Sequence, residues 1–567
     1  MNQIYQSHEV LGNFTKNLGE LFIRNKELFG NKPAFAFNVD SIYQTKTWSE
    51  LVDDIFSFSN FLLSKNLNAT DKIAIVSANS YTRLVVEMAT MCSGITAVPI
   101  FACYPKEMLE KLIEFSEVNF LIVDDVEKFL SLKTNVPADR IKRFSECEEL
   151  IKSNTYAKTP NSDVKNISAD TLAMIMFTSG TSKFPKGVML THKNILSQQK
   201  ALDLKWKLPS GLRFLCYLPW HHSFGGLFER FLVINNGGCL YLDDSFGRDI
   251  DKLIANFKQA RPHLYFSVPQ VYQQIVSRVL IDKMVKEVFF HPELKFVFTA
   301  AAPLPLSVSD VFKRNNIPVV EGWGLTETSP CCTLTEQKLD RTPGIVGIPI
   351  PEVELKFAEE QEILVRGPNI MKGYYKLPEE TKKVLDDDGW FYTGDVGEYT
   401  EEGLKIVSRK DRIFKLANAE KVFPVKIEES VRKKCNYIRF IYVLGSGEPS
   451  PYALVFPNFE LLNANSSCVQ IDDCAKPLNL PDFKGCFNNC LKDINLTAEI
   501  RFEQIKRAVV INRELSLERD ELTPSMKLVP RAIEKNYAEY IECLKNGNES
   551  ALPADAYMID LSVDIKK

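Results

Sequence analysis

The stretch that decides the fold of this chain reads Phe177-Thr178-Ser179-Gly180-Thr181-Ser182-Lys183-Phe184-Pro185-Lys186-Gly187. It follows an apolar run at residues 172–177, which is typical of a buried strand. A strand that ends in hydroxyl groups, glycines and a lysine offers backbone N–H groups, O–H donors and a cation at one place, and these groups bind a polyphosphate. The G-x-x-x-x-G-K-S/T spacing of a Walker A loop is absent. The stretch therefore predicts a phosphate-binding turn of a different kind.

The composition is that of an ordinary globular protein. Hydrophobic residues make up 45% and charged residues 25% of the 567 residues, and a chain of this length is expected to form two or more domains. The formal net charge of -4 gives no basic excess, which argues against nucleic acid as a partner.

Cysteine usage and the N-terminal residues bear on the compartment. The 13 cysteines are scattered and form no C-x-x-C pair, so zinc and thioredoxin-type chemistry are not expected. Such unpatterned cysteines indicate a reducing compartment, and we predict a cytoplasmic location. No signal peptide is expected, because no basic segment precedes an apolar core. No run of 18 apolar residues exists, so we expect no membrane span and at most a peripheral membrane contact.

The first 330 residues alternate between short apolar runs and amphipathic segments. Runs at residues 73–76, 120–123, 264–268 and 296–298 have the composition of buried strands, and residues 108–115 have a helical pattern. This alternation predicts βαβ units and a largely parallel sheet.

The pattern changes twice further along the chain. Residues 341–407 are rich in glycine and proline with short alternating strands, which predicts a small barrel or antiparallel sheet. After about residue 409 the chain is charged and mixed, as in a separate α+β domain. The polar, asparagine-rich residues 458–486 are expected to form mainly loop.

The opening stretch resembles the phosphate loop of the acyl-adenylate-forming family, which contains acyl-CoA synthetases, luciferases and adenylation domains. That loop runs aromatic-Thr-Ser-Gly-Thr-Thr-Gly-x-Pro-Lys-Gly. The resemblance implies that Thr178, Ser179, Thr181 and Lys186 hold the β- and γ-phosphates of ATP. Lys183 stands at a position where the loop of the family has a glycine, and lysine does not easily adopt the backbone conformations open to glycine.

A second motif, Glu321-Gly322-Trp323-Gly324-Leu325-Thr326-Glu327-Thr328, matches the family pattern aromatic-Gly-x-Thr-Glu. The resemblance implies that Trp323 stacks on adenine, that Thr326 bonds a phosphate, and that Glu327 ligates Mg²⁺ through its hard oxygen. Residues 299–304 resemble the strand end that lies against the nucleotide and the acyl pocket, with alanines at two positions where glycine is usual.

Two further segments resemble the ribose-binding and hinge regions of the family, at residues 389–395 and 408–415. A carboxylate can accept hydrogen bonds from both hydroxyls of a ribose, and Asp395 is the candidate, with Arg409 as its partner. Asp411 matches the hinge about which the C-terminal domain rotates, and Lys415 matches a nucleotide-contacting lysine.

The last two motifs concern the reacting carboxylate. Residues 521–531 resemble the terminal Leu-Thr-Pro-x-x-Lys-x-x-Arg segment of long-chain fatty acyl-CoA synthetases. There, Lys527 would reach the carboxylate and the α-phosphate, because a cation between two approaching anions stabilises the developing charge. In residues 218–226, His222 matches a histidine that lines the acyl tunnel or gates carboxylate entry. A buried structural histidine is the alternative for this position.

The resemblance thus implies a complete set of site residues. The predicted catalytic residues are Lys527, Thr326, Glu327 and His222. The predicted metal ligands are Glu327 and Thr178, and the predicted hinge is Asp411. The predicted nucleotide-binding residues are Thr178, Ser179, Gly180, Thr181, Lys186, Ala301, Glu321, Gly322, Trp323, Thr326, Asp395, Arg409 and Lys415.

The resemblance also implies an architecture. We expect an α/β N-terminal adenylation domain at residues 1–408, with two αβα subdomains and a small β-barrel. A smaller, mobile α+β C-terminal domain is expected at residues 409–567. No Gly-x-Ser-x-Gly elbow with a His/Asp set and no Gly-x-Gly-x-x-Gly after a strand appear, so serine hydrolase and NAD chemistry are unsupported.

The predicted activity is the ATP- and Mg²⁺-dependent conversion of a carboxylic acid, a medium- or long-chain fatty acid, to acyl-AMP, followed by thioester formation with CoA. Two alternatives stay open. The acyl group could pass to a carrier-protein thiol or an amine. Alternatively, the chain could be a nucleotide- or acyl-binding pseudoenzyme, for which Lys183 and Ala419, at positions where glycine is usual, are the support.

Overall fold

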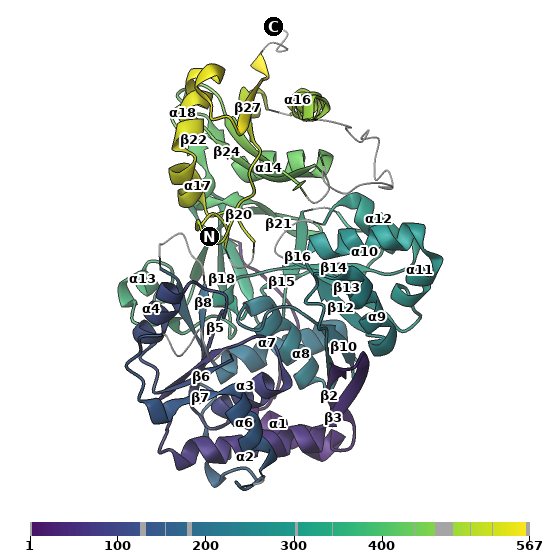
Figure 1. The fold of residues 1–567 in the computed structure, drawn as a ribbon, viewed down its shortest axis with the longest axis vertical. Coiled ribbons are helices and arrows are strands. Elements are labelled where there is room, and N and C mark those ends of the chain that lie inside the picture. Colours follow the sequence, from purple (N-terminus) through teal and green to yellow (C-terminus); the bar gives the residue numbers. More distant parts are fainter. Residues whose placement is uncertain are drawn as a thin grey trace.

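A computed structural model gives the fold of the chain (Figure 1). It describes residues 3–124, 132–153, 155–178, 184–300, 304–342, 344–435, 437–459, 480–498, 500–523 and 526–562.

Within these residues, the strands form two large sheets, a two-stranded ribbon and a four-stranded sheet. The first sheet has 14 strands in the order β1 (Tyr5–Gln6), β17 (Glu354–Phe357), β18 (Glu362–Arg366), β20 (Phe391–Thr400), β21 (Gly403–Arg409), β16 (Ile345–Pro349), β15 (Thr333–Leu334), β14 (Val319–Trp323), β13 (Phe296–Thr299), β12 (Leu264–Ser267), β10 (Arg213–Cys216), β11 (Cys239–Leu242), β2 (Pro33–Val39) and β3 (Ile42–Thr47). The second sheet has seven strands in the order β19 (Gly373–Tyr374), β9 (Lys186–Thr191), β8 (Leu172–Thr178), β5 (Thr96–Ile100), β4 (Lys72–Val76), β6 (Phe120–Val123) and β7 (Ile141–Arg143). The ribbon pairs β22 (Phe414–Lys415) with β23 (Lys421–Val422), and the last sheet contains β24 (Ile438–Leu444), β25 (Tyr452–Pro457), β26 (Arg507–Ile511) and β27 (Ala556–Asp560).

The helices are grouped by whether they precede or follow strand β22. Those before β22 are α1 (Leu18–Phe29), α2 (Trp48–Ser64), α3 (Tyr81–Cys92), α4 (Lys106–Ser116), α6 (Phe144–Lys152), α7 (His192–Trp206), the π-helix η3 (Phe224–Glu229), α8 (Arg230–Asn235), α9 (Ile250–Ala260), α10 (Pro269–Ile281), α11 (Lys283–Phe289), α12 (Leu306–Arg314) and α13 (Pro378–Lys382). Those after it are α14 (Pro424–Lys434), α16 (Leu480–Thr497), α17 (Pro530–Asn536) and α18 (Ala538–Asn546). Short 3₁₀ turns include η4 (Thr326–Thr328) and η6 (Lys410–Arg412).

Local sequence explains where the main helices begin. Thr47 caps α2 by accepting a hydrogen bond from the backbone N–H of Glu50, and the Glu50 carboxylate accepts one from the backbone N–H of Thr47. Ser80 caps α3 in the same way through the N–H of Arg83. Each cap satisfies backbone donors that the first helical turn leaves free, so the helix starts at a defined residue.

The helices cover both large sheets in layers (Figure 1). Helix α2 contacts β2 and β3 of the 14-stranded sheet, whereas α3 contacts β4 and β5 of the second sheet, and the two helices pack against each other. Helices α7 and α8 also pack together, with α7 against β9 and α8 against β10 and β11. These four helices therefore lie between the sheets.

The predicted strands are present with nearly the predicted bounds. The runs at residues 73–76, 120–123, 264–268 and 296–298 lie in β4, β6, β12 and β13, and the pairings of β4 with β6 and of β12 with β13 are parallel. The antiparallel strands predicted after residue 341 continue the 14-stranded sheet from β14 through β15 and β16. The prediction of a large α/β part followed by a smaller α+β part is confirmed.

One loop prediction was wrong in part. Of the asparagine-rich residues 458–486, those from Leu480 onward form the start of α16, because a helix of 18 residues packs its apolar stripe, including Phe487 and Leu491, against the core of the C-terminal part. Residues 460–479 lie outside the described residues.

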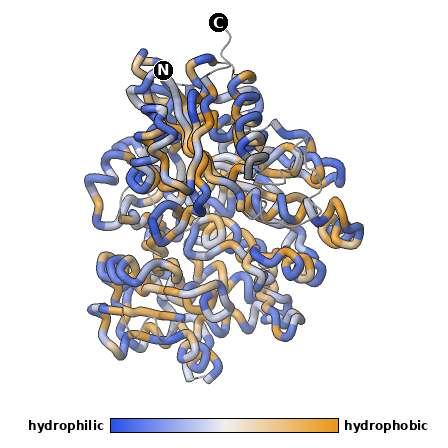
Figure 2. Tube along the Cα trace, turned by 45° about the horizontal axis from the view of Figure 1, so that its top comes forward, coloured by the Kyte–Doolittle hydropathy of each residue, from blue (hydrophilic) through white to orange (hydrophobic). Residues whose placement is uncertain are grey.

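We call the part from β22 onward the C-terminal domain and the part before it the N-terminal domain. The predicted boundary between residues 408 and 409 falls at the end of β21 and stays a prediction. The strands of the C-terminal domain are mainly apolar, as the orange segments at the top of Figure 2 indicate, and β25 is buried along its whole length. In the described part of the chain, no helix combines the length and the apolar composition that crossing a membrane requires.

Candidate active site

Parallel strands bring several predicted residues to one edge of the 14-stranded sheet. Strand β14 ends at Trp323 and lies beside β13, which ends at Thr299. Ligands of open α/β sheets bind outside the carboxyl ends of the strands. Gly322 is tightly enclosed here, because a Cβ atom on it would lie 2.9 Å from the ring of Phe298. Glycine is therefore the residue that fits this position.

Trp323, Asp395 and Arg409 form one hydrogen-bonded cluster. The indole N–H of Trp323 donates to Asp395 Oδ2 at 2.9 Å, and Arg409 Nη1 donates to Asp395 Oδ1 at 2.8 Å. Strands β20 and β21 hold the pair, since Asp395 and Arg409 are register partners. Burial alone would lower the pKa of Arg409, but the attraction of Asp395 and Asp411 outweighs it and raises that pKa. The cluster is a fixed carboxylate at the N–H edge of an aromatic ring.

Lys527 approaches this cluster from the C-terminal domain. The backbone N–H of Thr523 donates to Lys527 O at 2.8 Å, and the backbone N–H of Lys527 donates to Thr523 Oγ1 at 3.1 Å. Although the residue is exposed, the protein around its ammonium group limits hydration, and this lowers the pKa of Lys527. Asp395 opposes this shift by attraction, and Arg409 adds to it by repulsion. The structure thus brings Lys527, Asp395 and Arg409 together.

His222 lies two residues before the π-helix η3. Its Nδ1 accepts a hydrogen bond from the backbone N–H of Phe224 at 3.3 Å. Burial, with a smaller contribution from repulsion by Lys527, lowers the pKa of His222 to about 4. The neutral ring then carries its proton on Nε2, which is free to donate. The hydroxyl of Thr326 donates a hydrogen bond to the hydroxyl of Ser223, the residue after His222, at 3.1 Å. This bond joins the start of η3 to η4.

Glu327 and Lys186 meet around Tyr374. The hydroxyl of Tyr374 donates to Glu327 Oε1 at 2.7 Å, and Lys186 Nζ lies 4.8 Å from the centre of the same ring. Burial and then the charge of Glu327 raise the pKa of Tyr374. Lys186 also pairs with Glu380 at 2.8 Å, and this bond, with Lys383, lowers the pKa of Glu380 to about 2. Tyr374 thereby fixes the Glu327 carboxylate.

The residues predicted to bind a metal fit a hard cation. Tyr374 donates a hydrogen bond to Oε1 of Glu327. In the described part of the chain, Oε2 of that carboxylate is the oxygen that could bind a cation. Thr178 ends β8 and is the register partner of Lys186, so its hydroxyl lies on the hairpin that carries this lysine. Carboxylate and hydroxyl oxygens are the donors that Mg²⁺ prefers.

Several predicted residues lie elsewhere or outside the described part. The carboxylate of Glu321 is engaged by Arg341, whose Nη2 lies 2.8 Å from Glu321 Oε2. Lys415 is exposed on the β22–β23 ribbon, and Asp411 lies in η6, 3.8 Å from Arg409. The predictions for Ser179, Gly180, Thr181 and Ala301, and the residue Lys183, lie outside the described residues.

Ala419, at a position where glycine is usual in the family, has a φ of 68°. This is the left-handed region, where a Cβ atom costs about 1–2 kcal/mol in an L-residue. Ala419, in the turn between β22 and β23, therefore has a backbone conformation that usually requires glycine.

Three contributing residues were not predicted from the sequence: Tyr374, Ser223 and Arg341. Their side chains contact Glu327, Thr326 and Glu321 from segments 47, 103 and 20 residues away. Ser223 directly follows the predicted His222, which is a signal that could have found it. No local signal distinguishes Tyr374 or Arg341 from the other tyrosines and arginines of the chain.

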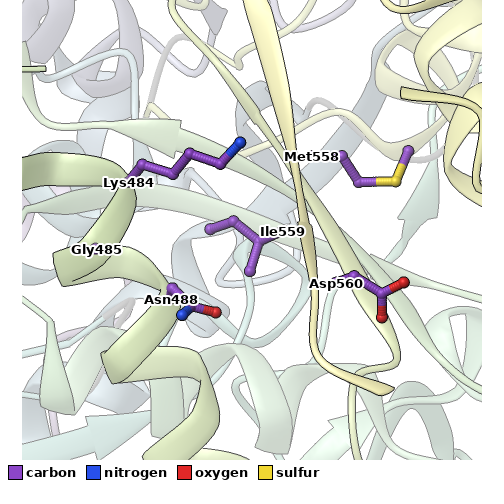
Figure 3. Close-up of a pocket in the computed structure, with 6 residues that line it drawn as sticks. All are labelled: Lys484, Gly485, Asn488, Met558, Ile559 and Asp560. Atoms are coloured by element: carbon purple, nitrogen blue, oxygen red, sulfur yellow. The ribbon is translucent and has the colours of Figure 1, made fainter. Parts of the chain in front are cut away.

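A pocket of about 330 Å³ lies away from these clusters, in the C-terminal domain. Figure 3 places Lys484 and Asn488 on helix α16 and Ile559 on strand β27, with the side chain of Ile559 directed toward the helix. None of the predicted site residues lines it.

An α/β sheet with a tryptophan–carboxylate–arginine cluster at its strand ends, faced by a lysine of a second domain, defines a two-domain adenylate-forming enzyme. Family comparison agrees: the AMP-binding enzyme model matches residues 22–375, and the model of the AMP-binding enzyme C-terminal domain matches residues 411–549. The chain belongs to the AMP-binding enzyme family. Within it, the chain is a distant relative of long-chain acyl-CoA synthetases and falls among the AMP-forming acid–thiol ligases.

Curated relatives cover nearly the whole chain. The peroxisomal long chain acyl-CoA synthetase 7 of Arabidopsis thaliana is 26% identical over 88% of this chain and 82% of its own length. The long-chain-fatty-acid–CoA ligase 6 of Homo sapiens is 26% identical over 93% of this chain and 86% of its own length.

Solved structures share the fold. The ATP-bound MatB from Rhodopseudomonas palustris has a TM-score of 0.75 at 22% identity and covers 92% of this chain and 99% of that chain. The o-succinylbenzoate CoA synthetase of Bacillus subtilis in complex with its acyl-adenylate intermediate has a TM-score of 0.72 at 19% identity, over 91% and 97% of the two chains.

Proposed function

We propose that this protein activates a medium- or long-chain fatty acid with ATP and transfers the acyl group to CoA. The carboxylate attacks the α-phosphorus of ATP, which forms acyl-AMP and releases pyrophosphate. The sulfur of CoA then attacks the acyl carbon, which forms the thioester and releases AMP. The observation that carries the proposal is the convergence of Lys527 on Asp395, Arg409 and His222. The names of the relatives, acyl-CoA synthetase and fatty-acid–CoA ligase, support CoA as the acceptor.

In this proposal, each residue has a defined part in adenylation. Asp395 accepts the ribose hydroxyls, and the ring of Trp323 stacks on the base. Lys527 lies between the carboxylate and the α-phosphate and offsets the charge of the two anions as they approach. The Nε2–H of His222 donates to a carboxylate oxygen of the acid. When Mg²⁺ is bound by Glu327 and Thr178, it supplies charge neutralisation for the phosphates.

The second step needs a different arrangement of the two domains. Lys527 lies near Asp395 and Arg409, and it belongs to a domain that joins β21 through η6. We place the rotation at Asp411, which lies in η6. Such a rotation would withdraw Lys527, admit CoA, and keep water away from the mixed anhydride during adenylation.

The test is pyrophosphate release from ATP and Mg²⁺ with a panel of carboxylic acids, with and without CoA. We expect release with fatty acids, and with CoA an acyl-CoA product and AMP in equal amounts. ATP binding without pyrophosphate release from any acid would contradict the proposal and favour the pseudoenzyme. Adenylation without any CoA thioester would contradict the second step alone.

Replacing Glu327 by alanine is expected to raise the Mg²⁺ concentration required for half-maximal pyrophosphate release by about tenfold or more, because the change removes a charged oxygen ligand. The measurement is a Mg²⁺ titration at fixed ATP and acid. The matched control is Tyr374→Phe, which keeps the carboxylate and removes only its hydrogen bond, and it should shift the titration less. An unchanged Mg²⁺ dependence of Glu327→Ala would remove this residue from the metal site.

The pH dependence of adenylation should report Lys527. Its ammonium form is the active one and its pKa is lowered, so the positive charge is lost as the pH rises through a value below the usual lysine pKa of 10.5. We expect the rate of acyl-AMP formation to fall on the alkaline side within that range. In Lys527→Arg the guanidinium stays charged, so the alkaline decrease should disappear even if the rate is lower. An identical alkaline decrease in both proteins would assign it to another group.

A further inference from the structure

Six aromatic side chains fill the space between the π-helix η3 and one face of the 14-stranded sheet. They come from the end of α7, from η3, and from strands β10, β12 and β13. All six are buried, with exposed fractions of 8% or less. We call them the aromatic cluster: Trp206, Phe214, Phe224, Phe228, Phe266 and Phe298.

The rings of this cluster are in contact. The ring of Phe228 lies 4.8 Å from that of Phe298 and 5.5 Å from that of Phe266, measured between ring centres. It also lies 5.8 Å from Trp206 and 6.1 Å from Phe224. Spacings of 4.5–7 Å are those of packed aromatic pairs. Phe228 therefore contacts rings from α7, η3, β12 and β13.

One end of the cluster lies against the predicted reaction centre. Phe298 limits the space at Gly322, where a Cβ atom would come within 2.9 Å of its ring. Phe224 donates its backbone N–H to the ring of His222. The other end is deep in the domain, where Trp206 packs 5.1 Å from Phe296. An apolar tail attached to a carboxylate at His222 would meet Phe224 and Phe298 first and Phe228 next.

The π-helix sets this arrangement. An i→i+5 turn adds a residue to the helical path, and such turns are concentrated at functional sites. In η3, Phe224 and Phe228 both contact Phe266 and Phe298, so this turn directs two rings onto the same sheet face. Gly225 and Gly226 allow the close approach, since Cβ atoms there would lie 2.6 Å and 2.1 Å from the carbonyl oxygens of Leu218 and Trp220.

We infer that Phe228 closes the acyl site of this protein and sets the upper limit of acyl length, so that medium-chain acids are preferred over long-chain acids. This inference rests on the proposed function and narrows its substrate range. On this inference, a chain that ends before Phe228 contacts Phe224 and Phe298 without displacing Phe228. A longer chain must displace a ring from a packed cluster, and each methylene that no longer fits reduces kcat/KM by a factor of about ten or more.

The test compares kcat/KM for pyrophosphate release with saturated acids from butyrate to stearate in the wild type and in Phe228→Ala. We expect the wild type to prefer octanoate to palmitate. In Phe228→Ala the ratio of palmitate to octanoate should rise by about tenfold or more. The matched control is Phe257→Ala. Phe257 is also fully buried, but it packs against Tyr265 on the opposite face of β12, so its loss should leave the ratio unchanged.

Two kinetic outcomes would overturn the inference: equal use of palmitate and octanoate by the wild type, or the same ratio in folded Phe228→Ala as in Phe257→Ala. If Phe228→Ala does not fold, Phe228→Leu provides the same comparison with a smaller cavity. A second measurement separates this inference from the proposed function. The octyl and hexadecyl esters of AMP lack the reactive acyl group, and calorimetry should give tighter binding of the octyl ester to the wild type and a higher hexadecyl-to-octyl affinity ratio in the variant. Equal affinities in both proteins would overturn the inference even if no acid is adenylated.

Discussion

Replacing Lys527 by alanine should lower the rate of acyl-AMP formation by about 10²–10³-fold. The ammonium group of Lys527 is attracted by Asp395 and repels a proton on His222, and in the proposed reaction it offsets charge that develops only as the two anions meet. The side chain is exposed, so its removal should leave stability nearly unchanged, within about 0.5 kcal/mol. Pyrophosphate release at saturating ATP and acid measures the first step.

The second half-reaction provides the internal control for this variant. Preformed acyl-AMP and CoA should still give acyl-CoA at close to the wild-type rate, because Lys527 is withdrawn in that step. Lys535→Ala, an exposed lysine of α17 in the same domain, should leave both steps unchanged. Normal adenylation by Lys527→Ala would contradict the role of this lysine, and loss of both steps would indicate damage to the domain instead.

Replacing Glu87 by alanine should reduce the free energy of unfolding by about 3–5 kcal/mol, the largest effect on stability that we predict. Glu87 and its two arginine partners have exposed fractions of 0%. Arg230 Nη2 donates to Glu87 Oε1 at 2.6 Å, and Arg83 Nε donates to Glu87 Oε2 at 3.3 Å. Without the carboxylate, two buried guanidinium groups keep their charge and lose their counter-ion. The ion pair between Glu87 and Arg230 also joins α3 to α8, the helix that directly follows η3.

The shift of the urea midpoint measures this effect. The matched control is Glu287→Ala, which removes the partner of Lys283 from another i,i+4 ion pair. Its side chains are 87% and 60% exposed, so the change should be below about 0.5 kcal/mol. A shift of Glu87→Ala as small as that of the control would show that the buried pair contributes little.

The ion pairs of Glu87 with Arg230 and Arg83 also make the free energy of unfolding depend on pH. Burial would raise the pKa of Glu87, but the attraction of Arg230 and Arg83 outweighs burial and lowers it. A carboxylate with a lowered pKa in the folded state stabilises the protein above its unfolded pKa, near 4.5, and this stabilisation is lost as the pH falls through the lower folded value. Acid should therefore destabilise the wild type more than Glu87→Ala.

Much of the fold could be predicted because its signals are local. The apolar run before Thr178 forms β8, and the runs at residues 73–76 and 296–298 form β4 and β13. A buried strand needs a continuous apolar run, which is a local signal. The start of α16 was missed because its polar, asparagine-rich sequence is helical only when the stripe with Phe487 and Leu491 packs on the C-terminal core.

The candidate site divides in the same way. The pairing of Asp395 with Arg409 was expected from the resemblance, and the structure has it at 2.8 Å. The engagement of Glu321 by Arg341 and of Glu327 by Tyr374 was not expected, because each contact depends on how separate strands are placed across the sheets. The residue type at 374 gives no indication of which carboxylate its hydroxyl will reach.

The sequence by itself determined the class of this protein, because phosphate binding, ribose binding and charge stabilisation each require particular residue types in a short, ordered segment. The tertiary structure alone decided how those segments meet and what fills the space beside them. Lys527 comes close to Asp395 only because two domains pack together, and Phe228 reaches Phe298 only because a π-helix lies on a parallel sheet. Contacts between residues far apart in the chain are set by the packing of whole elements, which no local pattern encodes.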